Sequence, residues 1–139
     1  MRVKLLNQAA TLPVRAHATD SGLDLFVCTE QTLMPGQPTK VQHGIAVEIP
    51  AGYEGQIRPR SSTLFRGLYV SFGTIDQGYR GEIATAVVNR TRHPIHLAPG
   101  DRISQLVIAP VSCVEAVEAD DLDDTARGDK GFGSTGRAS

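Results

Sequence analysis

The chain has 139 residues and a formal net charge of -1, with 14 Lys and Arg against 15 Asp and Glu. This length fits one domain, and the near-neutral charge argues against a protein that binds the backbone of nucleic acids. Fourteen Gly and eight Pro interrupt the chain too often for a helical bundle. Because the chain has four Phe, three Tyr and no Trp, we expect a core of Val, Ile, Leu and Ala.

Short segments rich in β-branched residues alternate with turns that contain Pro and Gly, which predicts many short strands. We expect strands at 3–6, 23–28, 45–49, 56–58, 68–71, 82–89, 95–97, 103–109 and 111–117. Such a chain forms an all-β sandwich or barrel of antiparallel strands. Residues 61–66 are expected to form a short helix, with a hydroxyl side chain as N-cap and Gly67 as the stop.

The composition changes near the carboxyl end. Residues 118–124 hold five acidic side chains, and residues 125–139 are rich in Gly, Ser and Thr with a net charge of +2. We therefore expect a β core at 1–117, an acidic linker at 118–124 and a glycine-rich arm at 125–139 that is mobile by itself.

Neither a secretory leader nor an apolar segment long enough to span a membrane is found, which predicts a cytoplasmic protein with no membrane partner. The two cysteines, Cys28 and Cys113, lie in apolar segments without the spacing of metal ligands. We expect both to be buried free thiols.

Three clusters combine Arg with Ser, Thr or Gly, at 59–62, 100–105 and 127–136. Arg offers a forked donor, hydroxyl groups offer short donors, and glycine lets backbone N–H groups approach an oxygen atom closely. Each cluster alone is more often a turn or a helix cap. Three clusters in one small neutral chain shift the balance toward a site for an anion such as a polyphosphate.

Asp76 precedes Gln77 and Gly78, and a two-residue hairpin loop there would place Asp76 and Tyr79 opposite each other on one face. A carboxylate and a phenol ring would then line one pocket. The alternative is that Asp76 only starts the turn through its own side-chain hydrogen bond. The chain has no Gly-x-Ser-x-Gly and no Walker A motif, so a serine hydrolase and a P-loop NTPase lose their usual support.

Five segments occur in the order and spacing of the five motifs of the homotrimeric dUTP pyrophosphatases, the dUTPases. They are DSGLDL at 20–25, PRSS at 59–62, GTIDQGYRGEI at 73–83, GDRISQL at 100–106 and the glycine-rich segment at 127–136. The chain resembles this family from about residue 15 to residue 137. The resemblance implies an all-β, jelly-roll-like barrel of the dUTPase type and a homotrimer with shared active sites. It also implies hydrolysis of dUTP to dUMP and pyrophosphate, which limits uracil incorporation into DNA and supplies dUMP for dTMP synthesis.

The same resemblance implies a role for individual residues. Asp76 would orient and deprotonate the water that attacks the α-phosphorus. Asp24 would hold waters bound to Mg²⁺, the expected cofactor, which the phosphates of the substrate otherwise chelate. The residues that correspond to phosphate contacts are Arg60, Ser61, Ser62 and Gln105.

Selection of the base and the sugar would fall to the third motif. The main chain around Ser71, Gly73, Thr74 and Ile75, facing the strand near Ala84, would read the uracil edge. Tyr79 would pack under the deoxyribose and leave no room for a 2′-hydroxyl. The arm would close over a neighbouring subunit's site, with Phe132 on uracil and with Arg127, Gly133, Ser134 and Thr135 at the γ-phosphate.

Three residues depart from the family pattern. Val70 stands where many members carry Asn, Gly78 where many carry an acid or an amide, and Lys130 where Gly is more usual. With Val70 in place, we expect the base edge to be read by the backbone.

Two other functions fit the resemblance less well. A dCTP deaminase-like enzyme shares the fold, but the Asp76–Tyr79 turn and the complete last motif favour a dUTPase. A trimeric binding or regulatory protein without catalysis is disfavoured by the intact Asp24 and Asp76. The expected partners are dUTP and further copies of the chain, without nucleic acid.

Overall fold

The structure, a computed structural model, describes residues 1–126, 128 and 129. Short runs of β-branched residues between turns give mostly strands in this part of the chain. The strands are β1 (Arg2–Leu5), β2 (Gly22–Phe26), β3 (Gln31–Leu33), β4 (Pro38–Gln42), β5 (Ile45–Glu48), β6 (Tyr53–Pro59), β7 (Leu68–Val70), β8 (Gly73–Ile75), β9 (Ala84–Asn89), β10 (Ile95–Leu97) and β11 (Arg102–Pro110), and helix α1 spans Ser61–Phe65.

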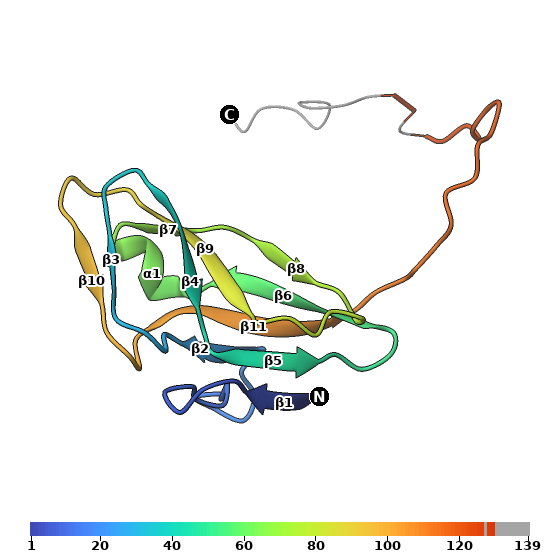
Figure 1. Cartoon of the computed structure of the whole chain (residues 1–139). Helices are drawn as coiled ribbons and strands as arrows, with labels where there is room; N and C mark the ends of the chain where they lie inside the picture. The colour runs from blue at the N-terminus through green and yellow to red at the C-terminus, as the bar shows by residue number, and fades with distance from the viewer. Residues whose placement is uncertain (127, 130–139) are drawn as a thin grey trace.

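The strands pair in antiparallel fashion and form several small sheets (Figure 1). The largest has the strand order β2-β11-β6-β8, a second has the order β4-β9-β7, and β1-β5 and β3-β10 form separate pairs. This arrangement confirms the predicted all-β, jelly-roll-like fold. In the described part of the chain, no helix has the length and apolar character needed to cross a membrane.

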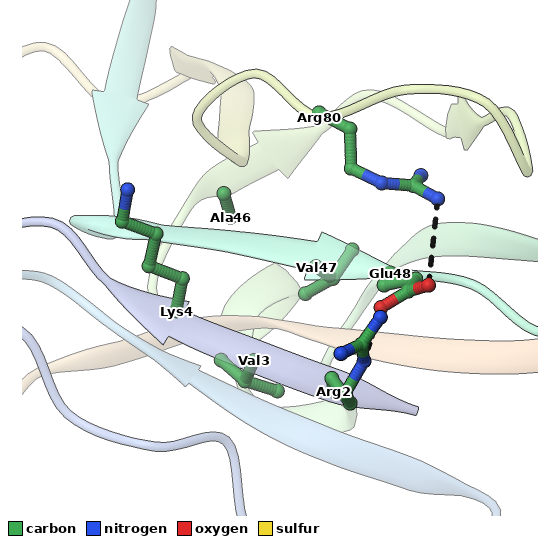
Figure 2. Close-up of a pocket in the computed structure, with 7 residues that line it drawn as sticks. All are labelled: Arg2, Val3, Lys4, Ala46, Val47, Glu48 and Arg80. Carbon is green, nitrogen blue, oxygen red and sulfur yellow. Dashed lines mark hydrogen bonds and ion pairs between the residues drawn. The ribbon is translucent and has the colours of Figure 1, made fainter.

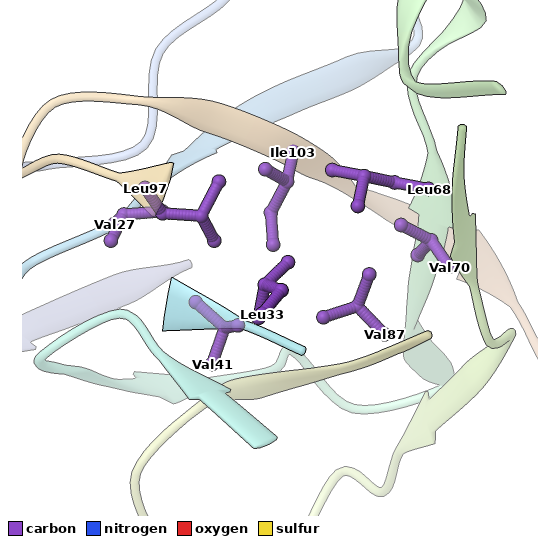
Figure 3. Packing of buried hydrophobic residues seen from close by; sticks show 8 residues of the cluster. All are labelled: Val27, Leu33, Val41, Leu68, Val70, Val87, Leu97 and Ile103. Carbon is purple, nitrogen blue, oxygen red and sulfur yellow. The ribbon is translucent and has the colours of Figure 1, made fainter. Parts of the chain in front are cut away.

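Two clusters of aliphatic side chains fill the space between the sheets. The first is shown in Figure 3 and consists of Val27, Leu33, Val41, Leu68, Val70, Val87, Leu97 and Ile103. The second consists of Leu25, Ile45, Val47, Ile49, Ile57, Ile83 and Leu106. Neither cluster contains an aromatic ring, so the aliphatic core predicted from the composition is confirmed.

The strand predicted at 111–117 is absent. The backbone N–H of Val111 donates to the carbonyl of Gly52 at 3.0 Å, and the chain then runs away from the sheets (Figure 1). Val114 and Val117 are 85% and 83% exposed, because their apolar pattern finds no partner strand within the described residues. Conversely, β3, β4 and β8 are not predicted from the sequence, since polar residues and glycine dominate them.

Helix α1 ends where Gly67 adopts a φ of 74°, which confirms the predicted stop. The predicted hydroxyl N-cap is wrong, because the N-cap residue is Arg60 and no side chain caps the helix. Thr63 is the buried residue of the helix, and its Oγ1 donates to the carbonyl of Ile103 at 2.9 Å. This bond fixes α1, and with it Arg60, against β11.

A buried polar chain begins at His43, which is 1% exposed. Its Nδ1 lies 2.9 Å from the carbonyl oxygen of Phe26, and its Nε2 lies 2.7 Å from Oγ1 of Thr85, which is 2.6 Å from Oγ of Ser104. Burial lowers the pKa of His43, although the hydrogen bond with Phe26 and the charge of Glu82 act in the opposite direction. The fold therefore favours the neutral imidazole.

Both cysteines are free thiols, as predicted. Cys28 is buried, but Cys113 is exposed, so the prediction of a buried thiol is wrong for Cys113. The reason is that Cys113 belongs to the segment after β11 that pairs with no strand within the described residues.

Candidate active site

The first candidate pocket lies where β2, β11 and the start of α1 meet. We call it the arginine pocket; it has a volume of about 260 Å³, and its polar lining is Asp20, Ser21, Asp24, Arg60, Ser61 and Gln105. The strand register places Gln105 of β11 opposite Asp24 of β2. Gly22 leaves room for the Gln105 side chain. A Cβ at position 22 would lie only 2.7 Å from Cδ of Gln105 and would clash with it.

Asp24 is buried in this pocket and holds two arginines. Its Oδ1 lies 2.7 Å from Nε of Arg60, and its Oδ2 accepts a hydrogen bond from a terminal nitrogen of Arg102 at 3.0 Å. Arg60 also donates to the carbonyl of Arg102 at 3.3 Å. These contacts fix the guanidinium groups and leave further N–H donors that can meet an anion.

The other predicted phosphate contacts lie around the same pocket. The Nε2 of Gln105 donates to the carbonyl of Pro59 at 2.9 Å, which holds the amide at the end of β6. Ser61 is the first residue of α1 and lines the pocket, whereas Ser62 is exposed on the same turn and does not line it. The structure thus brings Arg60, Ser61 and Gln105 together and places Ser62 beside them.

The second candidate pocket lies beside residues 76–79. We call it the turn pocket; it has a volume of about 240 Å³ and is lined by Lys40, Thr74, Ile75, Asp76, Tyr79, Glu82 and Ala84. The backbone N–H of Tyr79 donates to the carbonyl of Asp76 at 3.0 Å, which closes a four-residue turn. The sequence prediction that Asp76 and Tyr79 line one pocket is confirmed.

The strands on either side of this turn belong to different sheets. β8 pairs with β6, whereas β9 pairs with β4 and β7. The N–H of Ser71 donates to the carbonyl of Ala86 at 2.9 Å, and beyond this bond the two segments diverge. The predicted turn is therefore confirmed, but the prediction that the two flanking strands pair with each other as a hairpin is wrong. β8 is an edge strand, and its Thr74 and Ile75 line the turn pocket with Ala84 of β9.

The arginine pocket and the turn pocket share no lining residue. Asp24 lies on β2 and Asp76 follows β8, and these strands are the two edges of one sheet. Three strand spacings across the sheet and about four residues along it separate the two Cα atoms by on the order of 20 Å. The two pockets of one chain are therefore separate sites, well apart on the sheet.

A groove of about 350 Å³ lies behind the turn, between β1, β5 and Arg80 (Figure 2). Glu48 of β5 accepts a hydrogen bond from Nε of Arg2, and this bond lowers the pKa of the Glu48 carboxyl. Its Oε1 lies 3.9 Å from a terminal nitrogen of Arg80. Arg80 also donates to the carbonyls of Gln77 at 2.7 Å and Tyr79 at 2.9 Å. Arg80 therefore ties the turn to β5.

Residues 1–126, 128 and 129 contain no group of three or more His, Cys, Asp or Glu that could hold a metal ion. The arginine pocket does offer the carboxylates of Asp20 and Asp24, which are hard oxygen donors of the kind that Mg²⁺ binds. This donor set fits an ion that keeps several waters and takes further ligands from a bound phosphate.

A family model described as dUTPase matches residues 8–136 of the chain. The chain belongs to the dUTPase family. Two deoxyuridine 5'-triphosphate nucleotidohydrolases are among its relatives. The protein of Gloeothece citriformis is 44% identical over 142 residues, which cover 100% of this chain and 98% of that protein. The protein of Hydrogenobaculum sp. is 48% identical over 139 residues, which cover 96% of each.

A solved structure of a dUTPase mutant from Staphylococcus bacteriophage 80alpha, with dUpNHpp, has a similar fold. It superposes with a TM-score of 0.91 at 30% identity, and the match covers 98% of each chain. Residues from each of the first four sequence motifs line the two pockets described above. The fifth motif contains Arg127, Phe132, Gly133, Ser134 and Thr135, which lie outside the described residues, as does Lys130.

Four charged residues in or beside the two pockets receive no individual role from the sequence, although the 100–105 cluster includes Arg102. Asp20 lines the arginine pocket. Arg102 pairs with Asp24, and Lys40 and Glu82 line the turn pocket. Arg102 and Glu82 stand inside motifs of the dUTPase family, which is a signal that could have drawn attention to them. Lys40 stands outside these motifs on β4, and only the packing of β4 beside β9 brings it to the pocket.

Proposed function

We propose that the chain hydrolyses dUTP to dUMP and pyrophosphate, as the names of its relatives indicate. The proposal depends most on one observation, the presence of Asp76 and Tyr79 in one small pocket. The relative from bacteriophage 80alpha was solved with dUpNHpp, which supports a deoxyuridine nucleotide as the ligand. In a cell, this activity limits uracil incorporation into DNA and supplies dUMP for dTMP synthesis.

Asp76 is the general base of the proposed reaction. It is the exposed first residue of its turn, where a water molecule can reach the carboxylate. The carboxylate takes a proton from this water as the water oxygen bonds to the α-phosphorus. The bond from the α-phosphorus to the bridging oxygen then breaks, and pyrophosphate leaves with the negative charge. General-base catalysis of this kind contributes about 10²–10⁴-fold.

The phosphates bind in the arginine pocket. Arg60 is held by Asp24 and offers its remaining N–H donors to the phosphate oxygens. Ser61, Ser62 and Gln105 supply further donors from the start of α1 and from β11. Donors that are fixed before the reaction stabilise the charge that develops on the leaving pyrophosphate.

Asp24 would also hold Mg²⁺ through water, with the phosphates of the substrate as the remaining ligands. The carboxylates of the arginine pocket support this assignment. The ion neutralises charge on the triphosphate when it is bound. Because Asp24 also pairs with Arg60, its carboxylate links the metal and the phosphate donors.

The turn pocket selects the base and the sugar. Val70 is buried in the first core cluster, so its side chain is directed away from any ligand, and the backbone of β8 is left to read uracil. The outer edge of β8 carries backbone groups that its sheet does not pair. Gly73, Thr74 and Ile75 present these groups opposite Ala84, and the main chain at Ser71, whose N–H is bonded to Ala86, precedes them. Tyr79 forms the wall under the deoxyribose.

Three copies of the chain form the working enzyme, and each active site combines the arginine pocket of one copy with the turn pocket of another. The separation of the two pockets within one chain supports this homotrimer. Large apolar side chains on the surface support it as well, including Phe65 at 91% and Phe72 at 58% exposure. Symmetric assembly of this kind repeats one mixed site around a threefold axis.

The arm closes the site. Phe132 stacks on uracil, and Arg127, Gly133, Ser134 and Thr135 contact the γ-phosphate of a dUTP bound by neighbouring copies. We base this part of the proposal on the fifth motif alone. An ordered lid excludes bulk water and fixes the geometry of attack.

The test is release of pyrophosphate from dUTP in the presence of Mg²⁺, by wild type and by Asp76→Asn. We expect rapid release by wild type and a loss of about 10²–10⁴-fold in kcat for the variant. Unchanged release by Asp76→Asn would contradict the role of Asp76. Release of ammonia from dCTP by wild type would instead indicate a deaminase, and binding of dUpNHpp without turnover of dUTP would indicate a binding protein.

A further inference from the structure

The ring of Tyr79 is held by the residues that follow it in the chain. Its Oη donates to the carbonyl of Glu82 at 3.2 Å, so the segment 79–82 folds back on the ring. Gly81 lies directly against this ring. A Cβ at Gly81 would stand 2.5 Å from Cζ and 2.9 Å from Cε2 of Tyr79, and closer still to its Oη. Non-bonded atoms do not approach so closely, so a side chain at Gly81 would force the Tyr79 ring or the backbone at residue 81 to move.

Glu82, whose carbonyl accepts this bond, is itself fixed to the neighbouring sheet. Its Oε1 accepts a hydrogen bond from the N–H of Gly44 at 3.0 Å, and its Oε2 accepts one from Nε2 of Gln42 at 2.5 Å. The next residue, Ile83, donates its N–H to the carbonyl of Ile45 at 2.8 Å. The carbonyl that receives the Tyr79 hydroxyl is therefore part of a rigid segment.

We infer that Gly81 and Glu82 determine the specificity of the enzyme for deoxyribose by fixing the position of the Tyr79 ring. This inference rests on the proposed function, in which the ring fills the space that a 2′-hydroxyl would need. A ring on a flexible side chain can turn aside and admit a hydroxyl group, whereas a ring that is bonded at its hydroxyl and packed against the backbone along one edge turns less easily. Gly81 lets the ring pack close to the backbone, and the Glu82 carbonyl keeps it there.

The test compares two glycines of the same motif. Neither Gly78 nor Gly81 has a positive φ, so the backbone accepts alanine at both positions. A Cβ at Gly78 meets no atom within 4 Å, which makes Gly78→Ala the matched control for Gly81→Ala. The measured quantity is the ratio of kcat/KM for dUTP to kcat/KM for UTP, with Mg²⁺ present.

We expect Gly81→Ala to lower this ratio by about tenfold or more, chiefly through a higher kcat/KM for UTP, whereas Gly78→Ala leaves it within about twofold. Tyr79→Phe keeps the ring and removes its bond to Glu82, and we expect a smaller decrease in the ratio. A purely structural role for Gly81 would lower the rates for both nucleotides together and leave the ratio unchanged.

The outcomes separate this inference from the proposed function. Failure of wild type to release pyrophosphate from dUTP would remove the proposed function, and the inference with it. An active wild type together with an unchanged ratio in folded Gly81→Ala would overturn the inference alone. If thermal melting shows that Gly81→Ala does not fold, Tyr79→Phe decides, and a ratio equal to that of wild type overturns the inference.

Discussion

Asp24 and Arg60 form a largely buried ion pair, in which Oδ1 of the carboxylate lies 2.7 Å from Nε of the guanidinium. Arg102 binds the other oxygen of the same carboxylate at 3.0 Å. Asp24 thus orients the arginine that we propose to bind phosphate, before any nucleotide arrives. Orientation in advance lowers the cost of ordering the donors on binding.

The first prediction concerns the dependence of the rate on Mg²⁺. Asp24→Asn keeps the shape of the side chain and removes its charge. Because Asp24 is proposed to hold the ion through water, the Mg²⁺ concentration for half-maximal rate should rise by about 10- to 100-fold. Asp101→Asn is the control, since Asp101 pairs with Arg66 at 4.0 Å and lines neither pocket. An equal Mg²⁺ requirement in wild type and Asp24→Asn would contradict this role.

The second prediction concerns stability against pH. Burial lowers the pKa of His43 in the folded protein, so between that pKa and the ordinary value near 6.5 the unfolded chain binds more protons. The contribution of neutral His43 to the free energy of unfolding should therefore be fully present above about pH 6.5. It should decrease as the pH falls through this window. The urea midpoint, measured from pH 7.5 to pH 5 at one protein concentration, checks this.

A variant pair isolates the contribution of His43 to that decrease. His43→Gln should flatten the dependence of the urea midpoint on pH over this window. His17→Gln should leave the dependence as in wild type, because His17 is exposed. A wild-type slope in His43→Gln would mean that other groups cause the loss of stability.

The third prediction concerns the turn that carries Asp76. Arg80 donates to the carbonyls of Gln77 and Tyr79 and also lies near Glu48. Arg2 pairs with Glu48 as well, but it makes no hydrogen bond to the turn. Arg80→Gln should lower kcat for dUTP by about tenfold or more, because small displacements of a catalytic group are costly. Arg2→Gln should stay within about twofold of wild type. Equal rates in both variants would exclude a positioning role for Arg80.

The fourth prediction concerns the arm. Deletion of residues 126–139 should reduce turnover of dUTP strongly and leave the homotrimer intact, because the arm is proposed to close the site and not to hold the copies together. Steady-state kinetics and the mass in solution measure the two effects. Dissociation of the trimer on deletion would instead assign the arm a structural role.

Much of the fold is predictable from local patterns. Apolar segments such as 45–49 and 103–109 coincide closely with β5 and β11, and Gly67 ends α1 as expected. The segment 111–117 has an equally apolar pattern but no strand beside it in the described chain. An apolar, β-branched sequence indicates that a segment can form a strand. Whether it does so depends on a partner strand beside it in the fold.

The residues of the candidate site can be predicted from the sequence. The local sequence does not show that they lie in two separate pockets of one chain. The motifs identify Asp24, Arg60, Asp76 and Tyr79, yet nothing in the local sequence shows that β2, which carries Asp24, and β8, which precedes Asp76, are the two edges of one sheet. That separation follows from the strand order β2-β11-β6-β8, which depends on long-range pairing. The contribution of Lys40 is hidden for the same reason.

The most direct test of the shared site mixes two variants that are each nearly inactive, Asp76→Asn and Arg60→Ala. Each variant carries one intact half of the proposed site. When the two are unfolded together in equal amounts and refolded, about a quarter of the sites should combine an intact Asp76 with an intact Arg60 from another copy. We predict recovery of about a quarter of the wild-type rate of pyrophosphate release. A mixture as inactive as its two components would contradict the account.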